Sequence, residues 1–150
     1  MLSTHHFTFL EFIDASGFTC TASSTYNHSF GCQNVYDGTG NSWFTKVGEG
    51  QDAWIKVNLH QQVNLARIDI KQTTYGRYKE LELTFSNGLS AIARCTERIL
   101  DRGWCNITLS TPVKTTFIKI DALDRLVNNL VQYGFEEMRL PANIGTLIAK

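Results

Sequence analysis

The stretch Ala53-Trp54-Ile55-Lys56-Val57-Asn58-Leu59 alternates apolar and polar side chains, which is the pattern of a β-strand with one buried face. The same period of two recurs in residues 66–71, 80–85 and 117–121. Ser86-Asn87-Gly88 predicts a hairpin turn, because Asn-Gly tolerates positive φ. Shorter candidate strands are Phe7–Ile13, Leu89–Cys95, Asn106–Leu109 and Phe135–Leu140, and Ala122–Leu130 is the one candidate helix. The sequence therefore predicts an all-β fold, an antiparallel β-sandwich or jelly roll.

The alternation also assigns individual side chains to faces. Arg67, Asp69 and Lys71 fall between Ala66, Ile68 and Ile70, so they are expected on the face that meets water. Trp43 and Trp54 carry the largest apolar side chains near the central strand, and both are predicted to fill the core.

Composition limits the function. The chain has 150 residues, the size of one domain, and its 14 basic side chains balance 14 acidic ones. This neutrality argues against nucleic-acid binding and against a polybasic membrane anchor. No apolar run reaches the ~20 residues of a transmembrane helix, and the first ten residues do not resemble a signal peptide.

Four cysteines allow three disulfide pairings. The simplest pairs Cys20 with Cys32 and Cys95 with Cys105, so that each bond closes a short loop. The alternative is four free buried thiols in a cytosolic protein. A zinc site is disfavoured because the sequence has no C-x-x-C and its histidines are scattered.

Two N-x-[ST] sequons start at Asn27 and Asn106, and both are candidate glycosylation sites. Together with an even number of cysteines they favour an oxidising, extracellular location, secreted or at the cell surface, and an intracellular one stays open. Motifs for common hydrolases, nucleotide binding and metalloproteases are absent from the sequence. Glu136-Glu137 is a carboxylate pair, but neighbours on a strand point to opposite faces. The sequence therefore predicts a protein that is not an enzyme.

An ordered set of motifs resembles the discoidin, or coagulation factor 5/8 type C, family of galactose-binding-like jelly rolls. The set begins with Thr21-Ala22-Ser23-Ser24, Asn34-Val35-Tyr36-Asp37-Gly38, Ser42-Trp43 and the stretch at residues 53–59. Residues 78–88, 116–120 and 134–140 then follow in the expected order. The resemblance implies a domain over residues 15–141, after an extension or first strand at 1–14 and before a tail at 142–150. The family often joins its two ends by a disulfide, whereas the cysteines here are internal.

The resemblance also implies where a ligand and a metal bind. Ligands of this family bind on loops at one end of the barrel, which correspond here to Thr25–Gly31, Phe44–Asp52 and Thr73–Tyr78. The candidate ligand-binding residues on these loops are Tyr26, His28, Phe44, Lys46, Tyr75, Arg77 and Tyr78. Many members hold a structural Ca²⁺, for which the matching residues are Asp37 and Glu137. The alternative is that Asp37 only caps its turn.

The resemblance implies a non-catalytic recognition module that binds a glycan or a cell-surface glycoprotein in adhesion or surface attachment. One alternative is a protein-interaction domain of the same fold in a larger assembly. The other is a phospholipid-binding discoidin domain, which the neutral charge does not favour.

Overall fold

Two long strands organise the fold, β3 (Trp54–Gln72) and β6 (Trp104–Ala122). The computed structural model describes residues 12–73, 80–95, 103–123, 132 and 134–142. The other elements are β1 (Thr19–Ala22), the 3₁₀ helices η2 (His28–Phe30) and η3 (Cys32–Val35), β2 (Trp43–Phe44), β4 (Glu80–Phe85), β5 (Ser90–Arg94) and β7 (Gly134–Arg139).

The two long strands pass from one sheet into the other. The beginning of β3, residues 54–58, pairs with the end of β6, and the pairing resumes at Val63 after a break in register. His60 lies in this break and has a φ of 58°. Strands that switch sheets at such irregularities turn the corners of a sandwich. The predicted strands at 55–59 and 66–71 are thus two halves of one bent strand.

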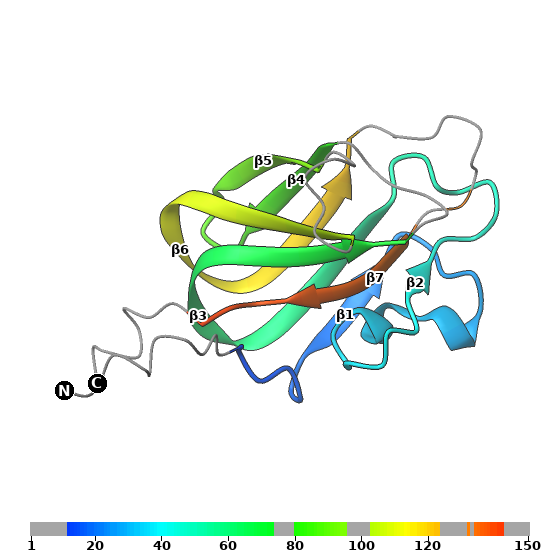
Figure 1. Cartoon of the computed structure of the whole chain (residues 1–150), viewed down its shortest axis with the longest axis horizontal. Coiled ribbons are helices and arrows are strands. Elements are labelled where there is room, and N and C mark those ends of the chain that lie inside the picture. The colour runs from blue at the N-terminus through cyan, green and yellow to red at the C-terminus, as the bar shows by residue number, and fades with distance from the viewer. Residues whose placement is uncertain (1–11, 74–79, 96–102, 124–131, 133, 143–150) are drawn as a thin grey trace.

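The halves of β3 and β6 define two layers, which curve around each other in Figure 1. The first sheet has the order β1-β3-β6-β4-β5, and the second has the order β2-β7-β3-β6. Every pairing is antiparallel. The predicted hairpin is confirmed, since Asn87-Gly88 joins β4 to β5 and Gly88 has a φ of 87°. The predicted antiparallel sandwich is therefore confirmed.

The core lies between the two sheets and is built by the inward side chains of each strand. Ile55, Val57 and Leu59 are buried, as their alternation predicts. Trp43 is fully buried, and its Nε1 donates to the carbonyl of Ser24 at 2.9 Å. The core assignment of Trp54 is wrong. Its neighbour Ile55 points inward, so Trp54 is half-buried on the outer side of the first sheet.

The solvent-facing assignment of Asp69 is also wrong, because its side chain is completely buried. Arg67 donates two hydrogen bonds to the Asp69 carboxylate, at 2.8 and 2.9 Å, and the bond to Asp69 raises the pKa of the Arg67 guanidinium. Arg139 on β7 lies directly opposite Asp69 and places its Nη2 at 3.7 Å from the carboxylate. The ring of Trp104 covers Arg139 at 3.9 Å. Neighbouring strands thus bury a position that alternation alone assigns to water.

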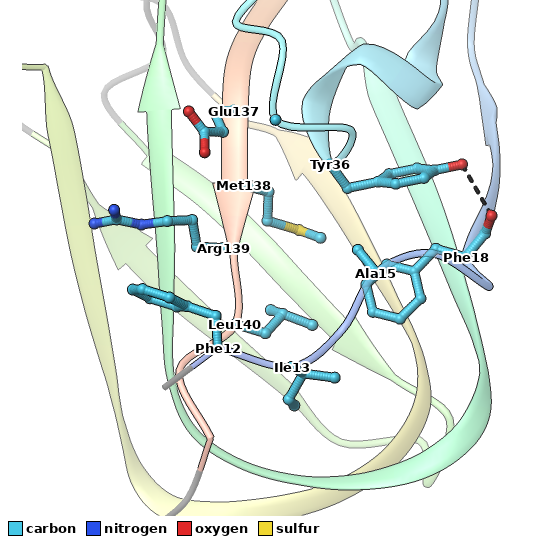
Figure 2. A pocket seen from close by; sticks show the side chains of 10 residues that line it. Phe12, Ile13, Ala15, Phe18, Tyr36, Glu137, Met138, Arg139 and Leu140 are labelled. Atoms are coloured by element: carbon cyan, nitrogen blue, oxygen red, sulfur yellow. Dashed lines mark hydrogen bonds between the residues drawn. The ribbon is translucent and has the colours of Figure 1, made fainter. Parts of the chain in front are cut away.

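The two ends of the described chain are held together without a covalent bond. Phe12 forms a β-bridge with Pro141, and the amide of Ile13 donates to the carbonyl of Leu140 at 2.8 Å. The Phe12 ring also lies 4.6 Å from the Arg139 guanidinium, and Figure 2 shows the two side by side. These contacts stand where the resembled family often has a terminal disulfide.

Both disulfides predicted as the simplest pairing are confirmed. Cys20 is bonded to Cys32, and Cys95 is bonded to Cys105, so the free-thiol alternative is wrong. The first bond ties η3 to β1, and the second ties the end of β5 to the start of β6.

Two predicted elements fall mainly on residues that the structure does not describe. Of the candidate helix Ala122–Leu130, only residues 122 and 123 are described, and Ala122 is the last residue of β6. Of the candidate strand Phe7–Ile13, only Phe12 and Ile13 are described.

Candidate functional site

An aromatic cluster lies where the loop after β1 meets β2. The rings of Tyr26 and Phe30 are 5.8 Å apart, and those of Phe30 and Phe44 are 5.3 Å apart in an edge-to-face arrangement. The amide of Tyr26 donates to the carbonyl of Phe44 at 2.8 Å, which fixes the two segments together. Tyr26 is 47% exposed, whereas Phe30 and Phe44 are half-buried. The cluster therefore presents one accessible ring on a packed aromatic base.

Local hydrogen bonds hold this cluster in shape. The side chain of Asn27 caps η2 by accepting from the amide of Ser29 at 2.8 Å. The buried side-chain amide of Asn34 donates to the carbonyls of Ser29 and Ser42, both at 2.8 Å. The Asn of the N-x-x-D-G motif thus ties η2 to the segment that enters β2, which explains the residue type at that position.

Two polar candidates flank the aromatic rings. His28 is exposed on η2, between Tyr26 and Phe30 in the chain. Lys46 is exposed just after Phe44, and its amide donates to the hydroxyl of Ser24 at 3.1 Å. Four of the seven predicted ligand-binding residues, Tyr26, His28, Phe44 and Lys46, are thus carried by two joined segments. We call Tyr26, His28, Phe30, Phe44 and Lys46 the rim cluster.

The remaining predicted ligand-binding residues, Tyr75, Arg77 and Tyr78, lie outside the described residues. Gln132, shortly before β7, donates to the carbonyl of Thr45, which lies between Phe44 and Lys46 in the chain, at 3.0 Å. From the sequence alone, the Phe30 ring could either cover the core or take part in the rim cluster. Only its contact with two rings at once identifies it as the base of the cluster.

A second feature is a cavity of about 220 Å³ beside β7, which is lined by Glu137, one of the two predicted calcium ligands. Gly38 and Tyr36 also line it, together with residues of the N-terminal segment. Figure 2 shows Tyr36 and Glu137 among the labelled side chains around it. Asp37, next to Gly38, accepts bonds at its Oδ1 from the amide of Thr39 at 2.9 Å and from its hydroxyl at 2.6 Å. Asp37 therefore does cap its turn, and calcium binding stays a prediction.

The described acidic side chains near this cavity do not form a cluster that could bind a metal ion by side chains alone. Across the part of the chain that the structure describes, no three His, Cys, Asp or Glu side chains gather around a common point. A Ca²⁺ ion needs 6–8 oxygen ligands, so backbone carbonyls would have to supply most of them. Glu136 does not join Glu137, because it forms an ion pair with Lys71 at 2.8 Å.

The two sequons occupy different surroundings. Asn27 is exposed in the loop of the rim cluster, and Asn106 is exposed in β6, in register with Asp69. Both side chains are accessible, and their glycosylation stays a prediction. Among the described residues, no helix is both long enough and apolar enough to span a membrane.

Comparison with known proteins identifies the fold. The model of the F5/8 type C domain family matches residues 19–133. The family 32 carbohydrate-binding module of NanJ from C. perfringens, solved in complex with galactose, has a TM-score of 0.73 at 21% identity and covers 89% of this chain and 99% of that one. An F5/8 type C domain from Bacteroides fragilis also gives 0.73, at 15% identity, with coverages of 89% and 97%.

A third solved structure is chitosan-binding module 2 of a chitosanase/glucanase from Paenibacillus sp. IK-5, in complex with chitotriose. It has a TM-score of 0.67 at 16% identity and covers 84% of this chain and 96% of that one. A comparison with curated protein sequences yields no significant match. The structural likenesses establish a shared fold, and the family model spans well over half of the chain. The chain belongs to the F5/8 type C domain family.

Proposed function

We propose that this domain is a non-catalytic carbohydrate-binding module that holds a glycan on the rim cluster. The observation that carries the proposal is the accessible Tyr26 ring, 47% exposed on the base formed by Phe30 and Phe44. An accessible ring can stack on the apolar face of a sugar. Neighbouring polar groups of His28 and Lys46 can then hydrogen-bond the sugar hydroxyls. Ligand sites commonly combine an apolar contact surface with a few polar groups that fix the orientation of the ligand.

The comparisons support a sugar as the ligand. The modules from C. perfringens and Paenibacillus were solved with galactose and with chitotriose. Two disulfides favour an oxidising compartment, so we place the domain outside the cell, where it serves in adhesion or surface attachment. Tyr75, Arg77 and Tyr78 remain proposed contributors to the same site.

A glycan array followed by titration of the best ligand tests this function. Tyr26→Ala removes the accessible ring, and an aromatic contact of ~1.4 kcal/mol corresponds to about tenfold weaker binding. Leu89→Ala is the matched control, because Leu89 is 58% exposed on the β4–β5 hairpin. Tyr75→Ala and Arg77→Ala are expected to weaken the same ligand.

Two results would contradict the proposal. One is an array on which no glycan binds, which would favour the protein-interaction alternative. The other is a ligand whose affinity is the same for Tyr26→Ala and for the wild type.

We further propose that Asp37 and Glu137, with backbone carbonyls of the turn, hold a structural Ca²⁺ ion. Gly38 and Glu137 line the same cavity, which supports this, and both hydrogen bonds from Thr39 go to one carboxylate oxygen of Asp37, Oδ1. The ion would stabilise the turn that follows η3. Millimolar Ca²⁺ should then raise the melting temperature of the wild type and leave Glu137→Gln unchanged. Equal melting temperatures of the wild type with Ca²⁺ and with chelator would refute it.

A further inference from the structure

The second sequon lies on the outward-facing row of β6. Its acceptor Asn106 and its hydroxyl residue Thr108 are both exposed, whereas their neighbours Cys105 and Ile107 are buried. The strand therefore points the side-chain amide and the hydroxyl into solvent on the same face. Within the described residues, neither of these two side chains forms a hydrogen bond. Both groups are thus available for modification.

The first sequon has different surroundings. The side-chain oxygen of Asn27 accepts from the amide of Ser29 and so caps η2. Asn27 also follows Tyr26, the accessible ring of the rim cluster, so a glycan attached there would lie against that ring. The residue two positions before it, Thr25, is not aromatic. Of the two sequons, the structure therefore favours Asn106.

An aromatic ring lies beside this acceptor. Trp104 precedes Asn106 by two positions on β6, so their side chains point to the same side, with Cα atoms about 7 Å apart. The Trp104 ring is half-buried, because the Arg139 guanidinium lies 3.9 Å from its centre, and part of its surface still reaches solvent. A sugar ring linked to Asn106 can stack its apolar face on that part.

The sequon also lies on the edge of a sheet. Residues 104–108 of β6 pair with β3 on one side. Among the described residues, β4 is the strand on the other side of β6, and it pairs only with Ile118–Ala122. The exposed Pro112 fits an edge position, because proline cannot donate to a neighbouring strand. An uncovered edge can pair with a strand of another chain, and a bulky hydrophilic group beside it hinders such pairing.

We propose that Asn106 carries an N-linked glycan whose first sugar packs against the Trp104 ring. The donor is an oligosaccharide on a lipid diphosphate, and a membrane-bound glycosyltransferase supplies the catalysis. A bond forms between Nδ2 of Asn106 and the anomeric carbon of N-acetylglucosamine. The bond from that carbon to the diphosphate oxygen breaks, and one amide proton passes to a base of the transferase. The oxidising compartment that the two disulfides favour is also the one in which this transfer takes place.

The glycan would have two effects on the domain. Its first sugar would extend the cover over Asp69, which is directly opposite Asn106 and completely buried. Its outer sugars would shield the β6 edge from other chains. Neither effect depends on the rim cluster or on its ligand, so this inference stands apart from the proposed function.

Glycopeptide mass spectrometry of the chain secreted from eukaryotic cells tests the modification. Asn106 should be glycosylated in the wild type and in Thr108→Ser, which keeps the sequon. It should be unmodified in Thr108→Val, which keeps the shape of the side chain without its hydroxyl. Thr111→Val is the matched control, because Thr111 is exposed on β6 outside the sequon, and it should keep the glycan.

Thermal unfolding then measures the packing on Trp104. Thr108→Val should melt roughly 2–4 °C below Thr108→Ser, the size expected of one aromatic contact in a domain of this length. Thr111→Val measures what the change from threonine to valine itself contributes. An endoglycosidase that leaves only the first sugar should keep the higher melting temperature, since that sugar makes the contact. In a Trp104→Leu background, the difference between Thr108→Ser and Thr108→Val should disappear.

Several results would overturn the proposal. One is an unmodified Asn106 in the secreted wild type. Another is an equal melting temperature of Thr108→Ser and Thr108→Val, once the effect seen in Thr111→Val is subtracted. A difference that persists in the Trp104→Leu background would exclude the ring as the contact. If Trp104→Leu does not fold, trimming decides, because a melting temperature that falls when only the first sugar is left would assign the contact to the outer sugars.

Discussion

The buried carboxylate of Asp69 gives the sharpest test of how the second sheet is stabilised. Asp69→Asn keeps the shape of the side chain and removes its charge, which leaves the guanidinium groups of Arg67 and Arg139 without their anion. Breaking a buried ion pair costs ~3–5 kcal/mol. Because the two arginine side chains are 34% and 35% exposed, water solvates them in part, and the lower end applies. We therefore expect a loss of about 3 kcal/mol, or roughly 10 °C in melting temperature for a domain of this size.

Urea unfolding of matched variants measures this loss. Glu136→Gln is the control, because it breaks the Lys71–Glu136 pair on the same sheet, where both side chains are 30% exposed. It should cost less than ~1 kcal/mol. Arg67→Gln should cost much less in the Asp69→Asn background than in the wild type, because its partner charge is already gone. A loss below about 1 kcal/mol for Asp69→Asn, or an equal loss in the control, would refute the reasoning.

Three further outcomes are expected. Removing either disulfide should lower the free energy of unfolding by about 3 kcal/mol, because the two bonds close loops of 12 and 10 residues. Variants in which both cysteines of one bond are replaced by serine measure this loss. Gly134→Ala should prevent folding, seen as lost near-UV circular dichroism, because the added Cβ would lie 1.7 Å from the carbonyl oxygen of Trp43; Gly17→Ala, with no atom within 4 Å, should fold normally. Burial is the larger cause that raises the pKa of the Tyr36 hydroxyl, and the charge of Asp37 is the smaller one. The contribution of the protonated hydroxyl to the free energy of unfolding is therefore complete below the pKa of the unfolded chain, about 10, and is lost as the pH rises through the folded pKa. Urea midpoints should consequently fall less steeply above pH ~10 for Tyr36→Phe than for the wild type.

The sequence alone determined the class of fold. The period-two alternation at residues 55–59 and the Asn87-Gly88 turn are local signals, and each depends on geometry within a few residues. The ordered motifs added the family, which the match over residues 19–133 confirms. The short spacing of the cysteines also favoured the pairing that the structure contains.

The candidate site was only partly visible in the sequence. Tyr26, His28, Phe44 and Lys46 could be named because they fall on loops that match the family. Phe30 falls on the same loop as Tyr26, but the sequence left open whether its ring covers the core, because its packing depends on rings that are four and fourteen positions away in the chain. Asp37 and Glu137 were named as metal ligands by resemblance; in the structure Asp37 caps its own turn and Glu137 lines the cavity beside β7.

Only the tertiary structure decided which polar side chains are buried and which charged side chains lie opposite each other. Alternation tells which face of a strand a residue occupies, but it does not tell what the neighbouring strands place on that face. Asp69 is buried because β7 and β6 bring Arg139 and Trp104 over it. Lys56 lies directly opposite Lys119 because of the register in which β3 and β6 pair. Register is a property of pairs of strands, so no single stretch of sequence contains it.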